Sequence, residues 1–135
     1  MQHVNLKILL IDDDPIYLLV AKKIIESAGF VGRLTVCADG QEAMYYLTGT
    51  EQNGDILPDI IFLDLDMPVM DGWSFLEEFE KFNNSLTKNI ILYIVTSSPD
   101  AFEISKSRQY GSVKGYLIKP VLKAKFHQIL TGLST

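Results

Sequence analysis

Short apolar runs alternate along this chain with stretches of helical character. The runs resemble strands that are buried on both faces of a parallel sheet, and they cover residues 6–11, 33–38, 59–64, 89–96 and 113–119. The stretches between and after them carry helical spacing or helix start and stop residues, and they cover residues 15–28, 40–49, 72–82, 98–111 and 122–133. The pattern therefore predicts strands and helices in strict alternation.

The amphipathic stretches differ in how clearly they mark a buried face. In 15–28, Leu19, Val20 and Ile24 recur at helical spacing after a start signal at Pro15. Two other stretches have a fuller apolar stripe, formed by Phe75, Phe79 and Phe82 in the third helix and by Leu122, Phe126, Ile129, Leu130 and Leu133 in the last one. These stripes predict helices that pack on the sheet.

The stretch 98–111 has the weakest helical pattern. Ser98 is a candidate cap and Pro99 a candidate first residue of this helix. Phe102 and Ile104 are poorly spaced for a stripe that faces a core. We therefore expect this helix to dock loosely.

Five strands alternating with five helices imply right-handed crossovers and an α/β fold, a doubly wound parallel sheet with helices on both faces. A chain of 135 residues is expected to form one domain, residues 1–135, with a core over about residues 5–133. In such a sheet, ligands bind outside the carboxyl ends of the strands, where the strand order reverses.

Composition and charge narrow the class of partner. A net charge of -5 argues against a nucleic-acid surface, which needs basic side chains. No apolar run approaches the ~20 residues that cross a bilayer, and the start of the chain does not resemble a signal peptide. We therefore expect a cytoplasmic protein without membrane or direct nucleic-acid contacts. The single cysteine, Cys37, is expected in the core.

Chemically active side chains collect at the expected strand ends. Carboxylates end the first and third strands, a hydroxyl ends the fourth and an ammonium ends the fifth: Asp12, Asp13 and Asp14; Asp64; Thr96; Lys119. Clustered carboxylates repel one another unless a hard cation such as Mg²⁺ neutralises them. Asp12, Asp13 and Asp64 are therefore a candidate magnesium site, beside which Thr96 and Lys119 could hold a phosphoryl group.

Each of these signals also has a structural interpretation. Asp13 or Asp14 could cap the helix that begins at Pro15. Thr96 could simply end its strand, and Lys119 could be a solvated charge. Only their joint placement at the strand ends favours a site.

Four segments also match a known family, in order and at fitting spacing. "ILLIDDDP", "IIFLDLDMPVMDG", "YIVTSS" and "GYLIKP" resemble the receiver domain of two-component response regulators, across essentially the whole chain. This resemblance implies a flavodoxin-like fold with strand order 2-1-3-4-5. It also implies a protein that catalyses only its own phosphorylation and dephosphorylation and is not otherwise an enzyme.

The resemblance assigns the acceptor and the metal ligands. Asp64 becomes the phosphoryl acceptor, and Asp12 and Asp13 form the acid pair that holds Mg²⁺ together with Asp64 and the backbone carbonyl of Asp66. The phosphoryl donor would be a sensor histidine kinase or a histidine phosphotransfer protein.

It also assigns the switch. Thr96 becomes the hydroxyl residue that turns toward the phosphate, and Tyr116 becomes the aromatic residue whose rotamer follows it. Lys119 becomes the lysine of the family's site, and its peptide bond to the following proline, Pro120, is commonly cis in the family. The helix at 98–111, the strand at 113–119 and the last helix would then form the face that a downstream protein reads, with homodimerisation of this face left open. By itself, Tyr116 is also interpretable as a half-buried strand aromatic.

Two rival functions remain at this stage. "IIFLDLD" also resembles the nucleophile motif of haloacid-dehalogenase-type phosphatases, although Asp12 and Asp13 precede it rather than follow a lysine as that family's metal acids do. The second rival is a receiver-like docking module that works without phosphorylation. Steady turnover of a phosphomonoester would distinguish the first rival, and failure to accept a phosphate the second.

Overall fold

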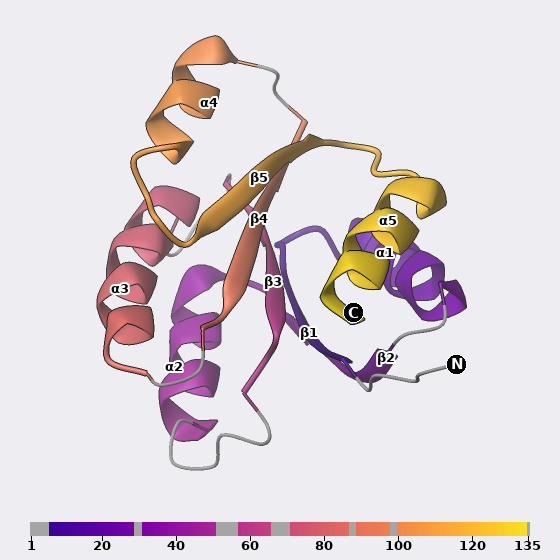
Figure 1. Cartoon of the computed structure of the whole chain (residues 1–135), viewed down its shortest axis with the longest axis horizontal. Coiled ribbons are helices and arrows are strands. Elements are labelled where there is room, and N and C mark those ends of the chain that lie inside the picture. The colour runs from indigo at the N-terminus through magenta and orange to yellow at the C-terminus, as the bar shows by residue number, and fades with distance from the viewer. Residues whose placement is uncertain are drawn as a thin grey trace.

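The strands form one parallel sheet in the expected order. The computed structural model describes residues 6–28, 31–50, 57–65, 71–86, 89–97 and 100–134. Within them the strand order is β2-β1-β3-β4-β5, which confirms the predicted topology (Figure 1). The strand bounds are β1 Leu6–Ile11, β2 Val31–Cys37, β3 Ile60–Asp64, β4 Ile91–Thr96 and β5 Val113–Ile118. Every neighbouring pair is parallel.

Helices cover both faces of the sheet. Figure 1 shows α1 beside α5 on one face, and α2, α3 and α4 on the other side, with α4 nearest β5. The helix bounds are α1 Pro15–Ser27, α2 Gly40–Thr50, α3 Gly72–Asn84, α4 Ala101–Ser107 and α5 Lys123–Ser134. The predicted alternation of strands and helices is therefore confirmed.

The sheet separates two apolar cores because successive side chains of a strand point to opposite faces. In β1, Leu9 and Ile11 belong to the core under α2 and α3, whereas Ile8 and Leu10 belong to the core under α1 and α5. The predicted stripe of α3 is buried in the first of these cores, with Phe75, Phe79 and Phe82 all largely inaccessible. Burial on both faces explains why β1 and β3 are unbroken apolar runs.

Helix α1 forms where predicted, but part of its apolar pattern faces solvent. The exposed fractions of Ile16, Leu19 and Val20 are 73%, 56% and 50%. Ala21 and Ile25, in contrast, are buried against the sheet. The spacing of Leu19 and Val20 thus indicated the helix correctly without marking its buried face.

Helix α4 is shorter than the predicted 98–111 and has a different cap. It begins at Ala101, and the Asp100 side chain accepts the Phe102 backbone N–H at 2.7 Å, so the cap is Asp100 and not Ser98. Ser98 and Pro99 lie outside the described residues. Phe102 is 75% exposed, in agreement with the weak apolar pattern of this helix.

The structure also bears on the single cysteine and on the possibility of a membrane-spanning helix. Cys37 is buried at the end of β2, and burial is the largest cause that raises the pKa of its thiol to about 12, so it is a core residue and a poor nucleophile. Among the residues that the structure describes, no helix combines the length and apolar character needed to cross a bilayer.

Candidate functional site

Two buried carboxylates lie side by side at the carboxyl ends of β1 and β3. Asp64 is the last residue of β3, and Asp12 directly follows β1, where its backbone N–H donates to the Cys37 carbonyl at 3.1 Å. Because Ile11 pairs with Leu63 in the parallel register, the next residues, Asp12 and Asp64, follow at the same level of the sheet. Asp12 is only 2% and Asp64 only 6% exposed, so both charges require partners.

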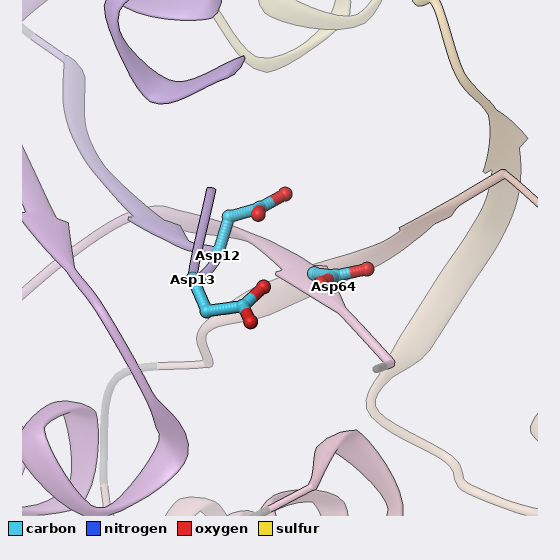
Figure 2. A group of neighbouring side chains, drawn as sticks. All are labelled: Asp12, Asp13 and Asp64. Atoms are coloured by element: carbon cyan, nitrogen blue, oxygen red, sulfur yellow. The ribbon is translucent and has the colours of Figure 1, made fainter. Parts of the chain in front are cut away.

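Asp13 completes a group of three acids at this edge. Carboxylate oxygens of Asp12, Asp13 and Asp64 all lie within 4.8 Å of one another, and Asp13 is exposed while the other two are buried (Figure 2). Figure 2 shows the Asp12 and Asp13 side chains coming from the end of the same strand and Asp64 from the neighbouring one. The predicted acid cluster is therefore present.

Lys119 supplies positive charge to this cluster. Its Nζ lies 2.7 Å from Asp12 Oδ2 and 3.7 Å from Asp64 Oδ1. The Lys119 backbone N–H donates to the Thr96 carbonyl at 2.7 Å, and the Lys119–Pro120 peptide bond is cis, as the resemblance implied. These contacts tie the residue that follows β5 to the end of β4 and direct its ammonium group to the acids.

A tyrosine that the sequence analysis did not single out also borders the site. Lys119 Nζ lies 4.2 Å from the centre of the Tyr17 ring, in the first turn of α1. Burial, followed by the negative charges of Asp12 and Asp64, raises the pKa of the Tyr17 hydroxyl to about 12. In the sequence, Tyr17 has no feature that distinguishes it from an ordinary helix residue, because its contact joins two segments about a hundred positions apart.

Asp14 has the structural role that the sequence left open. Its side chain accepts the backbone N–H groups of Ile16 and Tyr17 at 3.0 and 3.3 Å, which makes it the N-cap of α1. Its own backbone N–H donates to Asp12 Oδ1 at 2.9 Å. The three consecutive acids therefore have different roles: Asp14 caps the helix, and Asp12 and Asp13 lie close to Asp64.

Thr96 and Tyr116 connect the site to α4. Thr96, at the end of β4, is 1% exposed, and Tyr116 on β5 is half-buried, as one interpretation of the sequence expected. The Tyr116 hydroxyl donates to Glu103 Oε1 of α4 at 3.1 Å. Burial, then the Glu103 hydrogen bond and the charges of Glu103 and Asp100, raises the pKa of Tyr116 to about 12, and a side-chain hydrogen bond with Thr96 acts in the opposite direction. Thr96 and Glu103 thus share one hydroxyl.

Gly72 allows the start of α3 to lie close to the end of β3. A Cβ atom at Gly72 would lie 2.6 Å from Leu65 Cα and 2.9 Å from the Asp64 carbonyl oxygen. The Gly72 N–H donates to the Leu65 carbonyl at 2.8 Å, and the Asp71 side chain caps α3. The Asp–Gly pair that ends the "DMPVMDG" segment therefore fixes how α3 starts beside Asp64.

The donor set fits a hard divalent cation. Asp12, Asp13 and Asp64 offer oxygen ligands of the kind that Mg²⁺ prefers. The Lys119 ammonium group pairs with Asp12 and Asp64. The acid cluster is therefore consistent with the Mg²⁺ site typical of receiver domains. The expected fourth ligand, the backbone carbonyl of Asp66, lies outside the described residues.

The chain belongs to the response regulator receiver domain family, whose model matches residues 8–131. Membership of this family decides against the phosphatase alternative, because a receiver is not a conventional enzyme.

Curated relatives include both short and long proteins. The probable methanogenesis regulatory protein FilR2 of Methanothrix harundinacea is 30% identical over 84% of this chain and 72% of its own length. The probable C4-dicarboxylate response regulator DctR of Bacillus subtilis is 36% identical over 92% of this chain, which spans only 50% of DctR. The sensor histidine kinase CheAY of Helicobacter pylori is 32% identical over 84% of this chain, which spans 13% of it.

Solved structures have the same fold. A two-component response regulator from Cytophaga hutchinsonii superposes with a TM-score of 0.85 at 24% identity, covering 97% of this chain and 99% of that one. The CheX-CheY-BeF3-Mg²⁺ complex from Borrelia burgdorferi contains a chain with a TM-score of 0.79 and 26% identity, covering 98% and 91%. This similarity agrees with the flavodoxin-like fold that the sequence predicted.

Proposed function

We propose that this receiver domain accepts a phosphoryl group on Asp64 in a Mg²⁺-dependent reaction and passes the resulting change to a partner protein. The observation that carries the proposal is the surroundings of Asp64: a carboxylate at a strand end, 6% exposed, with an ammonium group 3.7 Å away and two further acids within 4.8 Å. A neighbouring ammonium group favours the charged form of a carboxylate, and the charged form is the nucleophile that this reaction requires.

The reaction is an in-line displacement at phosphorus. An oxygen of the Asp64 carboxylate attacks the phosphorus of a phosphohistidine, the O–P bond forms, and the N–P bond breaks with its electron pair left on the imidazole. When bound at the acid cluster, Mg²⁺ would neutralise the charge of the transferring group. Lys119 and the Thr96 hydroxyl are placed to bind phosphoryl oxygens, because Lys119 Nζ already faces Asp64 and Thr96 ends the adjacent strand β4. Hydrolysis of the acyl phosphate returns the carboxylate.

The donor would be a sensor histidine kinase or a histidine phosphotransfer protein. This part of the proposal is supported by family membership and by the similarity to the sensor kinase CheAY. The structure of the Borrelia CheY with CheX also shows that a receiver of similar fold binds a protein partner.

The signal would leave through α4, β5 and α5. A phosphoryl group on Asp64 would attract the Thr96 hydroxyl, and Tyr116 would then lose its hydrogen bond with Thr96 but keep the one with Glu103. Exposed apolar side chains lie on α4 at Phe102, on β5 at Ile118 and just before α5 at Leu122. Such side chains suit a protein partner or a second copy of the chain.

Labelling with a small donor tests the acceptor. With Mg²⁺ and acetyl phosphate, the wild type should gain one acid-stable, alkali-labile phosphate by mass spectrometry, and Asp64→Asn should gain none. Asp14→Asn is the matched control, because asparagine caps helices as well as aspartate does and should leave labelling intact. Equal labelling of Asp64→Asn would refute the acceptor. An unlabelled wild type would favour the docking module without phosphorylation.

Amide exchange tests the output. Adding beryllofluoride and Mg²⁺ should change exchange within residues 100–130 of the wild type, and Thr96→Ala should lose most of that change. Changes confined to other segments, or changes that persist fully in Thr96→Ala, would contradict the proposed route.

A further inference from the structure

The Lys119 ammonium group lies close to side chains from three different segments of the chain. Asp12, after β1, lies 2.7 Å away, and Asp64, at the end of β3, lies 3.7 Å away. The centre of the Tyr17 ring, in α1, lies 4.2 Å away. Only 19% of the lysine side chain is exposed. The carboxylates bind the ammonium through charge, and the ring binds it through the negative face of its π system.

The position of the Tyr17 ring is itself fixed. The Asp14 side chain accepts the Tyr17 backbone N–H at 3.3 Å, and the Tyr17 side chain packs against the core under α1 and α5. A lysine side chain has several rotatable bonds and many alternative positions. A rigid aromatic wall beside it removes the positions in which the ammonium group would turn away from the acids.

We infer that Tyr17 is a positioning residue whose ring holds the Lys119 ammonium group against the phosphoryl acceptor. This inference rests on the proposed phosphorylation of Asp64. Before transfer, the ammonium pairs with the Asp12 and Asp64 carboxylates. After transfer, the charge next to it has moved from the Asp64 carboxylate to the phosphoryl oxygens, and the ring keeps the ammonium within reach of them. The ring also excludes water from one side of the ammonium, which strengthens both pairings.

The inference distinguishes the ring from the hydroxyl. Tyr17→Phe keeps the aromatic face, and Tyr17→Leu keeps only the apolar volume. With acetyl phosphate and Mg²⁺, we expect Tyr17→Phe to be labelled within about twofold of the wild-type rate, and Tyr17→Leu roughly 3- to 10-fold more slowly, the range expected for one partly desolvated cation–π contact. Tyr45→Leu, at an exposed tyrosine of α2, is the matched control and should react at the wild-type rate.

A double-mutant cycle separates positioning from a general structural effect. If the ring acts through the lysine, Tyr17→Leu should cause no further loss in a Lys119→Ala background, because the contact is already gone. The same fold-loss in both backgrounds, a Tyr17→Leu rate equal to the wild type, or a Tyr17→Phe rate as low as that of Tyr17→Leu would overturn the inference.

A spectroscopic measurement tests the contact without any Tyr17 variant. The ε-methylene protons of Lys119, identified by their loss in Lys119→Arg, should be shifted upfield by the ring current of Tyr17 in the wild type. Unshifted signals would overturn the inference even if the Tyr17→Leu protein failed to fold. Failure of the proposed function would look different: the wild type itself would remain unlabelled by acetyl phosphate, and the inference would fall with it.

Discussion

The centre of the sheet and its β5 edge are built differently. Every residue of β3 is buried, whereas in β5 only Leu117 is fully buried and Ile118 is 40% exposed. Asp12 and Asp64 lie at the ends of the central strands, and Tyr116 and Lys119 belong to the edge. The acid cluster therefore lies in the part of the fold where local unfolding is expected to cost the most free energy. The residues expected to move, Tyr116 and Lys119, lie where local unfolding is expected to cost less.

Helix α4 accentuates this difference. It has 7 residues, and its Phe102 is 75% exposed. Its described side-chain contacts with neighbouring elements include the Glu103–Tyr116 hydrogen bond at 3.1 Å and Lys106 Nζ at 4.4 Å from the Trp73 ring. Polar contacts of this kind are weaker than burial of a large apolar side chain. The α4 helix is therefore expected to be held less firmly than α3, which buries three phenylalanine rings.

The largest expected effect is a loss of stability from a substitution under the centre of the sheet, compared with a substitution on α4 near its edge. Phe79→Ala removes a ring that is fully buried between α3 and the sheet, and it should lower the free energy of unfolding by about 3–5 kcal/mol. Phe102→Ala, on α4, should change it by no more than about 0.5 kcal/mol because the side chain is exposed. Urea unfolding followed by circular dichroism measures both. Similar losses in the two variants would contradict the contrast.

The next effect concerns the close contact between the start of α3 and the end of β3. Gly72→Ala places a Cβ atom against the Leu65 backbone and should cost about 1–3 kcal/mol through crowding. Gly49→Ala is the matched control, since a Cβ atom there meets no other atom within 4 Å and removal of a helical glycine should stabilise by up to about 1 kcal/mol. Opposite signs are thus expected from thermal unfolding, and a loss in both variants would show that Gly72 is not a special position.

A smaller effect separates the consecutive acids. Asp14→Ala removes the cap of α1 and should cost about 1 kcal/mol of stability while Mg²⁺ binding by calorimetric titration stays near the wild-type value. Asp13→Ala should do the reverse: Mg²⁺ binding and labelling are lost and stability changes little, because its side chain is exposed. Unchanged Mg²⁺ affinity in Asp13→Ala would remove Asp13 from the proposed ligands.

The last effect is a loss of stability at alkaline pH. The pKa of Cys37 is raised from 9.0, and those of Tyr17 and Tyr116 from 10.0, each to about 12, so folding favours the protonated forms. Their contribution is fully present below pH 9 and is lost as pH rises through the window from about 9 to 12. Cys37→Ala should flatten the part of the stability profile between pH 9 and 10, where the unfolded chain titrates the thiol before the tyrosines. An unchanged slope there in urea titrations would contradict the burial effect.

Several features were predictable because they depend on local pattern. The apolar runs of β1 and β3 identify strands buried on both faces, and the topology rule then brings Asp12 and Asp64 to one edge. The same reasoning located the α3 stripe of Phe75, Phe79 and Phe82. Helix ends were predicted less well: the predicted cap Ser98 and the observed cap Asp100 differ by two residues, a displacement that is common at helix ends.

By itself, the sequence determined the alternation of strands and helices and the identity of the acids, because hydrophobic period and turn residues are properties of short segments. The strand order 2-1-3-4-5 was implied by the family resemblance. Only the tertiary structure decided which face of α1 is buried: Ala21 and Ile25 pack into the core under α1 and α5, whereas Ile16 and Leu19 are exposed. It alone also decided that Tyr17 lies against Lys119 and that Glu103 shares the Tyr116 hydroxyl with Thr96. These contacts join segments that are distant or differently oriented along the chain, and their formation depends on the final packing of α1, α4 and β5 rather than on any local preference.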